Sequence, residues 1–290
     1  NPTSSSVPVM CHVLQARMQA VAGDFAAAQA SLRAAFALDP DMRSMAWTRQ
    51  DLLLWQAWVY IRQGNLAEAE QLLAPIQMDS EDKTAVPQQA DLYEIVLADM
   101  QLAAAAFPEA EETLDRVMKA FPYGCRVGSI VYPLVMQAAA QFAQYKINQA
   151  QKTMEKALRM AAPEEMKRPF LDRSASILPL LTLITQTGRV AADTHQFAQQ
   201  LIETIYHVEG IKPAAIQAEM ASLTVAASIS DRELEVLQLV SSGLSNQAIA
   251  VRMMITVSTV NTHLKHIYQK LDVHNRTEAV IRAQALNLPL

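Results

Sequence analysis

Small and large apolar residues recur along most of this chain with a period of about forty residues. Each repeat contains two alanines separated by twelve residues. A large apolar residue stands three residues before the second alanine, in turn Phe25, Leu66, Phe107 and Ile147. The pattern predicts two antiparallel helices per repeat, because alanines let two backbones approach closely. The alanine pairs, each separated by twelve residues, return at intervals of 41, 41 and 40 residues: Ala16 and Ala28, Ala57 and Ala69, Ala98 and Ala110, Ala138 and Ala150.

A short turn segment stands before the large apolar residue of each copy and is expected to reverse the chain. Residues 188–190 begin a fifth, divergent copy, with Leu181 and Asp193 at the alanine positions. No single hairpin can bury its own apolar face, so the copies are expected to stack into an all-α superhelix. The four turn segments are Gly23-Asp24, Gly64-Asn65, Ala105-Ala106 and Tyr145-Lys146.

The last sixty residues show a different pattern, in which short helices are marked by their own start and stop residues. Ser230 and Glu233 have the spacing of a capping box. Gly243 stands where a first helix would need a residue that tolerates a positive φ. Ser245 and Thr256 are each expected to cap a following helix.

The helix expected after Thr256 has two distinct faces. Its apolar residues recur at intervals of four, three and four residues. A set of polar residues repeats the same intervals and begins two positions earlier. Two positions correspond to roughly 200° around a helix, so the stripes lie on opposite sides. One side is suited to packing and the other to a DNA major groove. The apolar stripe is Val260, Leu264, Ile267 and Leu271, and the polar stripe is Ser258, Thr262, Lys265 and Gln269.

Residues 231–288 resemble the LuxR-type helix-turn-helix domain, which implies a four-helix DNA-binding fold. The family usually has a basic residue where this chain has Asn261, and an Asn at this position would favour adenine. The matching residues are Arg232, Glu233, Glu235, Val236, Leu237, Gly243, Ser245, Asn246, Ile249, Ala250, Thr259, Val260, His263, Leu264, Lys270, Leu271, Val273, Arg276 and Ala279.

The repeats resemble tetratricopeptide repeats, most clearly in the first copy, although their period is longer than the usual ~34 residues. We therefore expect a tetratricopeptide-like sensor or interaction domain at 9–208, a linker at 209–228 with a short helix at 214–223, and the helix-turn-helix domain at 229–290. Together these modules resemble the carboxy-terminal part of large ATP-dependent LuxR-type activators. That resemblance implies an inducer or protein effector at the repeats, an ATP-binding module in the parent protein and recruitment of RNA polymerase.

The DNA-binding residues are expected on the second and third helices of the small domain and at the start of the fourth. Thr262 and Lys265 are assigned to base edges, and His263 to a phosphate or a neighbouring helix end. The resemblance to LuxR-type domains implies that two copies associate on DNA through the fourth helix, 276–286, with Val280, Ala283 and Gln284 as candidates. The predicted contact set is Ser245, Asn246, Arg252, Ser258, Thr259, Asn261, Thr262, His263, Lys265 and Arg276, of which Ser245, Asn246, Thr259 and Arg276 are assigned to phosphates.

Composition and charge narrow the class of protein. The formal net charge is −5 and 18% of residues are charged, but residues 252–276 hold four cations and one anion, a local basic footprint. Two cysteines exclude a disulfide framework, and their scarcity fits the cytoplasm. No apolar run is long enough to span a bilayer.

Enzymatic chemistry is not indicated. The sequence contains no phosphate-binding loop of the Gly-x-x-x-x-Gly-Lys type, no metal-ligand spacing and no convergent acid, base and nucleophile. We therefore expect a DNA-binding transcription regulator that is not an enzyme and holds no cofactor in these 290 residues. A scaffold whose repeats bind a protein partner, with DNA binding weakened through Asn261, is the alternative. The Trp47, Trp55 and Trp58 stripe is interpreted as core rather than as a stacking site.

Overall fold

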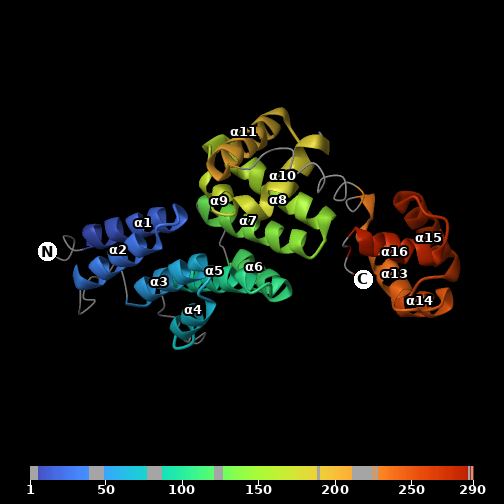
Figure 1. The fold of residues 1–290 in the computed structure, drawn as a ribbon, viewed down its shortest axis with the longest axis horizontal. Coiled ribbons are helices and arrows are strands. Elements are labelled where there is room, and N and C mark those ends of the chain that lie inside the picture. The colour runs from blue at the N-terminus through green and yellow to red at the C-terminus, as the bar shows by residue number, and fades with distance from the viewer. Residues whose placement is uncertain are drawn as a thin grey trace. The chain divides into compact units, whose positions relative to one another are not determined.

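The computed structural model describes residues 6–38, 49–76, 87–120, 127–187, 190–210, 225, 228–286, 288 and 290. Every regular element in these segments is a helix, as Figure 1 shows, which confirms the predicted all-α class. The chain divides into two compact units, Asn1–Cys125 and Arg126–Leu290. This division falls inside the repeat region. The short helix predicted at 214–223 lies outside the described residues.

Unit 1 consists of helical hairpins, in which each helix packs against the next one along the chain (Figure 1). The second helix of each hairpin begins at the large apolar residue that the repeat pattern singled out. The hairpin prediction is therefore confirmed, and the second helix of each hairpin begins at the predicted residue. The helices are α1 (Ser6–Val21) with α2 (Phe25–Leu38), α3 (Arg49–Gln63) with α4 (Leu66–Leu73), and α5 (Pro87–Ala103) with α6 (Phe107–Ala120).

The repeated alanines lie where the two helices of each hairpin approach. None of the eight is more than 1% exposed. The four turns also share one backbone geometry, because Gly23, Gly64, Ala105 and Tyr145 all have φ between 57° and 84°. In each turn the amide after this residue donates to the carbonyl five positions earlier, as Asp24 does to Gln19 at 2.9 Å. These bonds satisfy carbonyl groups that the end of the first helix would otherwise leave unpaired.

Neighbouring hairpins of unit 1 are joined by a buried polar contact. The Trp58 indole nitrogen on α3 donates to the Asp99 carboxylate on α5 at 2.9 Å. Both side chains are buried, and Trp55 packs edge-to-face on Trp58 with ring centroids 6.0 Å apart. The interpretation of Trp58 as a core residue is confirmed. Trp47 lies outside the described residues.

Unit 2 begins with a fourth hairpin of α7 (Val127–Ala143) and α8 (Ile147–Ala161) and ends with the small four-helix domain. The divergent fifth copy is a hairpin of α10 (Ser174–Thr187) and α11 (Ala192–Glu209), and its turn at 188–189 lies outside the described residues. Two short elements that the repeat pattern did not predict precede it, the 3-10 helix Ala162–Glu164 and α9 (Arg168–Leu171). Each has a proline in its first turn, a position that tolerates proline.

The final domain comprises α13 (Asp231–Ser241), α14 (Asn246–Met253), α15 (Val257–Leu271) and α16 (Arg276–Ala285). Helix α15 packs on each of the other three helices. The core of the domain combines apolar residues from all four helices. The most deeply buried are at most 2% exposed: Val236, Leu237, Val240, Ile249, Val260, Ile267, Leu271, Ala279 and Ala283. The three helices expected from their caps, and the fourth expected at 276–286, are therefore present.

Candidate nucleic-acid interface

Side-chain hydrogen bonds fix the start of every helix in the final domain. The expected capping box is present, with the Ser230 amide donating to Glu233 Oε2 at 2.7 Å and the Glu233 amide donating to Ser230 Oγ at 3.4 Å. Ser245, Thr256 and Asn275 cap α14, α15 and α16 through amides at 3.2, 3.1 and 2.9 Å. Gly243 has the positive φ, 81°, that its position after α13 required.

The two faces of α15 are separated as predicted. Val260, Leu264, Ile267 and Leu271 are all buried, with Leu264 the most exposed at 6%. The polar stripe lies in solvent: Ser258, Thr262, Lys265 and Gln269 are exposed. Among these, Thr262 already donates its hydroxyl proton to the Ser258 carbonyl at 3.0 Å. Its oxygen and methyl group therefore remain available to a ligand.

An ion pair between a half-buried lysine and a buried glutamate holds the end of α15 on α13. Lys270 Nζ lies 2.5 Å from Glu233 Oε2, and the Glu233 side chain is only 4% exposed. His266 Nδ1 lies 3.8 Å from the other carboxylate oxygen. Burial alone would raise the pKa of Glu233, but the hydrogen bonds from Lys270 and Ser230 outweigh it, so its pKa lies below the ordinary value. The sequence did not indicate this pairing, since Glu233 was explained as a cap residue.

Arg276 is occupied inside the domain. Its Nη2 donates to the Val240 and Leu244 carbonyls at 2.8 and 2.7 Å, and its Nη1 donates to Asn246 Oδ1 at 3.4 Å. Asn246 Nδ2 in turn donates to Asn261 Oδ1 at 2.9 Å. The phosphate contacts expected of Arg276 and Asn246 stay predictions, but in the free protein both side chains connect helices instead. No spacing in the sequence pointed to this network.

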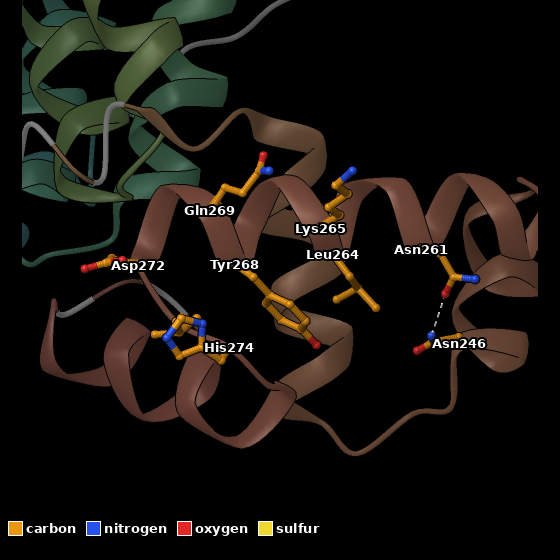
Figure 2. Close-up of a pocket in the computed structure, with 9 residues that line it drawn as sticks. Asn246, Asn261, Leu264, Lys265, Tyr268, Gln269, Asp272 and His274 are labelled. Atoms are coloured by element: carbon orange, nitrogen blue, oxygen red, sulfur yellow. Dashed lines mark hydrogen bonds between the residues drawn. The ribbon is translucent and has the colours of Figure 1, made fainter.

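A groove runs along one flank of α15 beside the loop that leads to α16 (Figure 2). In Figure 2 the side chains of Leu264 and Tyr268 point downward from α15. Those of Lys265 and Gln269 point upward, from the opposite side of the helix. Asn246 and Asn261 form one end of the groove. The remaining lining residues are Asp272, Val273 and His274.

The predicted contact residues differ in their exposure to solvent and in their bonds within the domain. Asn246 and Arg276 are half-buried and joined to Asn261 by the hydrogen bonds described above, and His263 is also half-buried. Of the four cations in the basic footprint, Lys270 and Arg276 have partners in the domain. The predicted contact residues that are exposed are Ser245, Arg252, Ser258, Thr259, Asn261, Thr262 and Lys265.

The residues proposed for self-contact need one correction. Ala283 is 0% exposed and belongs to the core of the domain, so it cannot face a second copy. Helix α16, which carries Ala283, packs on α13 and α15. Gln284 is exposed and Val280 is half-buried. The sequence pattern missed Ile281, which is 60% exposed on the same helix.

The part of the chain that the structure describes holds neither a membrane-spanning helix nor a metal-binding cluster. Within it, every helix is too short or too polar to traverse a lipid bilayer. The same residues contain no group of three His, Cys, Asp or Glu side chains arranged to hold a metal ion.

Comparison with known proteins gives two family matches. Residues 227–283 match bacterial regulatory proteins of the luxR family, and residues 3–187 match the MalT-like TPR region. The HTH-type transcriptional regulator MalT of Vibrio campbellii is 28% identical over 190 residues, which cover 62% of this chain and 21% of that protein. MalT of Vibrio cholerae is 26% identical over 200 residues, covering 66% and 22%.

A second kind of relative matches a much shorter stretch of the chain. The response regulator protein VraR of Staphylococcus aureus is 48% identical over 60 residues, which cover 21% of this chain and 29% of VraR. No solved structure gives a significant match. The chain spans about a fifth of the length of the MalT relatives.

Proposed function

The chain belongs to the family of the MalT-like TPR region and carries a LuxR-family helix-turn-helix domain, and from this premise we propose that it is a bacterial transcription regulator. The observation that carries the proposal is the construction of α15. Its buried stripe packs on the domain core, and its opposite stripe presents Thr262 and Lys265 to solvent. A helix held in this way can enter a DNA major groove without losing its own packing.

We assign sequence reading and backbone anchoring to different residues. Lys265 is a donor suited to guanine O6 and N7, and Thr262 offers an oxygen and a methyl group to a neighbouring base. Ser245 and Thr259 lie at the starts of α14 and α15, where free amide groups and the helix dipole favour a phosphate. Arg252 adds an exposed cation at the end of α14.

The repeats supply the proposed input, and RNA polymerase is the proposed output partner. The relatives that share the repeats are named transcriptional regulators, which supports a non-enzymatic, cytoplasmic role and a small-molecule or protein effector at the helical hairpins. We assign self-association on DNA to the exposed face of α16, where Ile281 and Gln284 are accessible. Binding should then be stronger on two adjacent half-sites than on one, because the first copy raises the effective concentration of the second.

Binding of the 290-residue chain to a randomised duplex pool tests the proposal. The wild type should enrich a short motif, and Lys265→Ala should weaken binding to it by about 1 to 3 kcal/mol and relax preference at one position. Lys152→Ala removes an exposed cation from repeat helix α8 and is the matched control, which should bind as the wild type does. Enrichment of no motif would instead favour the scaffold alternative, in which the repeats bind a protein partner and DNA binding is weak or lost.

A further inference from the structure

Three polar side chains form a directional chain of hydrogen bonds that ends at the recognition surface. Arg276 Nη1 donates to Asn246 Oδ1 at 3.4 Å, and Asn246 Nδ2 donates to Asn261 Oδ1 at 2.9 Å. Figure 2 shows the second of these bonds, with the Asn261 oxygen turned toward Asn246 and its nitrogen turned away. These hydrogen bonds connect the start of α16, the start of α14 and the exposed part of α15.

Because Arg276 stands at one end of this series of hydrogen bonds, it determines the direction of both bonds. An Asn carboxamide presents an acceptor at one end and a donor at the other, and its orientation is decided by its partners. Arginine has only donors, so Asn246 must turn its oxygen toward Arg276 and its amino group toward Asn261. Asn261 must then receive this donor with its own oxygen. Arg276 cannot swing away without breaking its short bonds to the Val240 and Leu244 carbonyls.

We propose that Asn261 reads DNA as a hydrogen-bond donor, with a preference for the acceptor edge of guanine. This inference rests on the proposed function. The usual Asn–adenine pair needs the carboxamide oxygen and nitrogen to face the base together. In this protein the oxygen of the planar group is directed at Asn246, so only the amino group faces outward. Guanine offers two adjacent acceptors, O6 and N7, whereas adenine and thymine each offer one acceptor and cytosine offers only a donor. This proposal differs from the adenine preference that the sequence predicts.

The position of Asn261 sets where this preference should appear in the binding site. Asn261 and Lys265 are both exposed and lie four residues apart on α15. Four residues correspond to about 6 Å along a helix, which is one or two base steps of DNA. Asn261 and Lys265 thus place two donors along the groove, and the preferred site should contain guanines one or two steps apart.

Reversal of the hydrogen-bond direction is the decisive experiment. In Asn246→Asp the new carboxylate still accepts from Arg276 but has no donor for Asn261. Asn261 must then turn its amino group inward and its oxygen outward. Selection from a randomised duplex pool with the 290-residue chain should show the guanine preference replaced at one position by adenine or cytosine, whose exocyclic amino groups are donors. A change of about tenfold is expected at that position, with the rest of the motif unchanged.

Two further variants identify the position and separate the explanations. Asn261→Ala should remove the preference at the same base pair, and Asn246→Ala should weaken it without reversing it. Because Asn261 is exposed, Asn261→Ala should leave the thermal melting of the domain unchanged. Thermal melting of all three variants, followed by circular dichroism, shows whether a loss of binding reflects lost structure.

The outcomes distinguish this inference from the proposed function. If the wild type enriches a motif but Asn246→Asp selects the same base, the directional chain does not set specificity and the inference is wrong. It is also wrong if the wild type selects adenine at this position, or if Asn261→Ala weakens binding to all sequences equally, as loss of a phosphate contact would. If the wild type enriches no motif, the proposed function fails and the inference fails with it.

Discussion

Side-chain caps begin every helix of the final domain, but not every helix of the repeats. In the repeats, the turn after the first helix of each hairpin uses a residue with positive φ, and the Asp24 side chain caps α2 by accepting from the Ala27 amide at 3.0 Å. Helices α4 and α8 then begin without any side-chain cap. In the final domain all four helices begin with a side-chain cap, as at Thr256 on α15.

This difference follows from the size of the two cores. Within unit 1, α3 packs on its hairpin partner α4 and on the neighbouring helices α2 and α5, so contacts with several helices determine its position. The final domain has only about sixty residues, and a domain of that size buries a smaller fraction of its surface on folding. Each local cap, worth typically ~1 kcal/mol, is therefore a larger share of its stability.

The largest expected effect is loss of the small core through Leu264→Ala. Leu264 is 6% exposed and lies on α15, which packs on α13 and α14, so its truncation should destabilise the final domain by about 2 to 5 kcal/mol. Amide NMR signals of residues 229–290 would report this loss. Tryptophan fluorescence should not change, because all three tryptophans lie in the repeats. Lys265→Ala, on the opposite face, is the control: if Leu264→Ala melts as Lys265→Ala does, the faces of α15 have been exchanged.

The Glu233–Lys270 pair gives the next effect, and it depends on pH. Because the folded-state pKa of Glu233 lies below its ordinary value of 4.5, its stabilisation is complete above that pH and declines as the pH falls through the folded-state pKa. Glu233→Gln should cost the final domain about 1 to 3 kcal/mol at pH 7 and less at pH 4. Urea unfolding followed by NMR at both pH values measures this.

Glu235→Gln is the matched control for that experiment. The Glu235 side chain is 44% exposed and pairs with the exposed Arg232, an arrangement that contributes little to stability. This variant should differ from the wild type only slightly at either pH. An equal loss at pH 7 and pH 4 in Glu233→Gln would show that packing, rather than the ion pair, is what the substitution removes.

Removal of a helix cap tests the comparison directly. Thr256→Ala removes the side-chain cap of α15 and should destabilise the final domain by ~1 kcal/mol. Asn65 stands at the corresponding place before α4 but makes no cap bond, so Asn65→Ala should change the stability of unit 1 by less than about 0.5 kcal/mol. Chemical denaturation of both variants measures the two values. Equal losses would remove the distinction between the regions.

The smallest expected effect is a gain of stability in the repeats. Ala105 has φ 58°, which costs a residue with a Cβ roughly 1 kcal/mol. Ala105→Gly should therefore stabilise unit 1 by about 0.5 to 1 kcal/mol, even though glycine loses more entropy on folding. Gly64→Ala places a Cβ at the same kind of position, φ 84°, and should destabilise it. The midpoint of tryptophan-fluorescence unfolding should move in opposite directions in the two variants.

The sequence by itself determined the features that depend on contacts between close neighbours in the chain. The repeat period located the second helix of each hairpin at Phe25, Leu66, Phe107 and Ile147, because a hairpin brings together residues at fixed short spacings. The capping box at Ser230 and the two faces of α15 were predicted for the same reason: each depends on residues three or four apart, which a helix places side by side.

Only the tertiary structure decided how distant polar groups share their donors and acceptors. Glu233 and Lys270 are 37 residues apart, and Arg276 reaches Val240 across 36. The sequence could list these groups but not their partners, because several arrangements satisfy the same apolar pattern. Burial leaves each acceptor needing a donor, and the packing of α13 to α16 determines which donor is near enough. The orientation of Asn261 follows from that choice, since Arg276 can only donate.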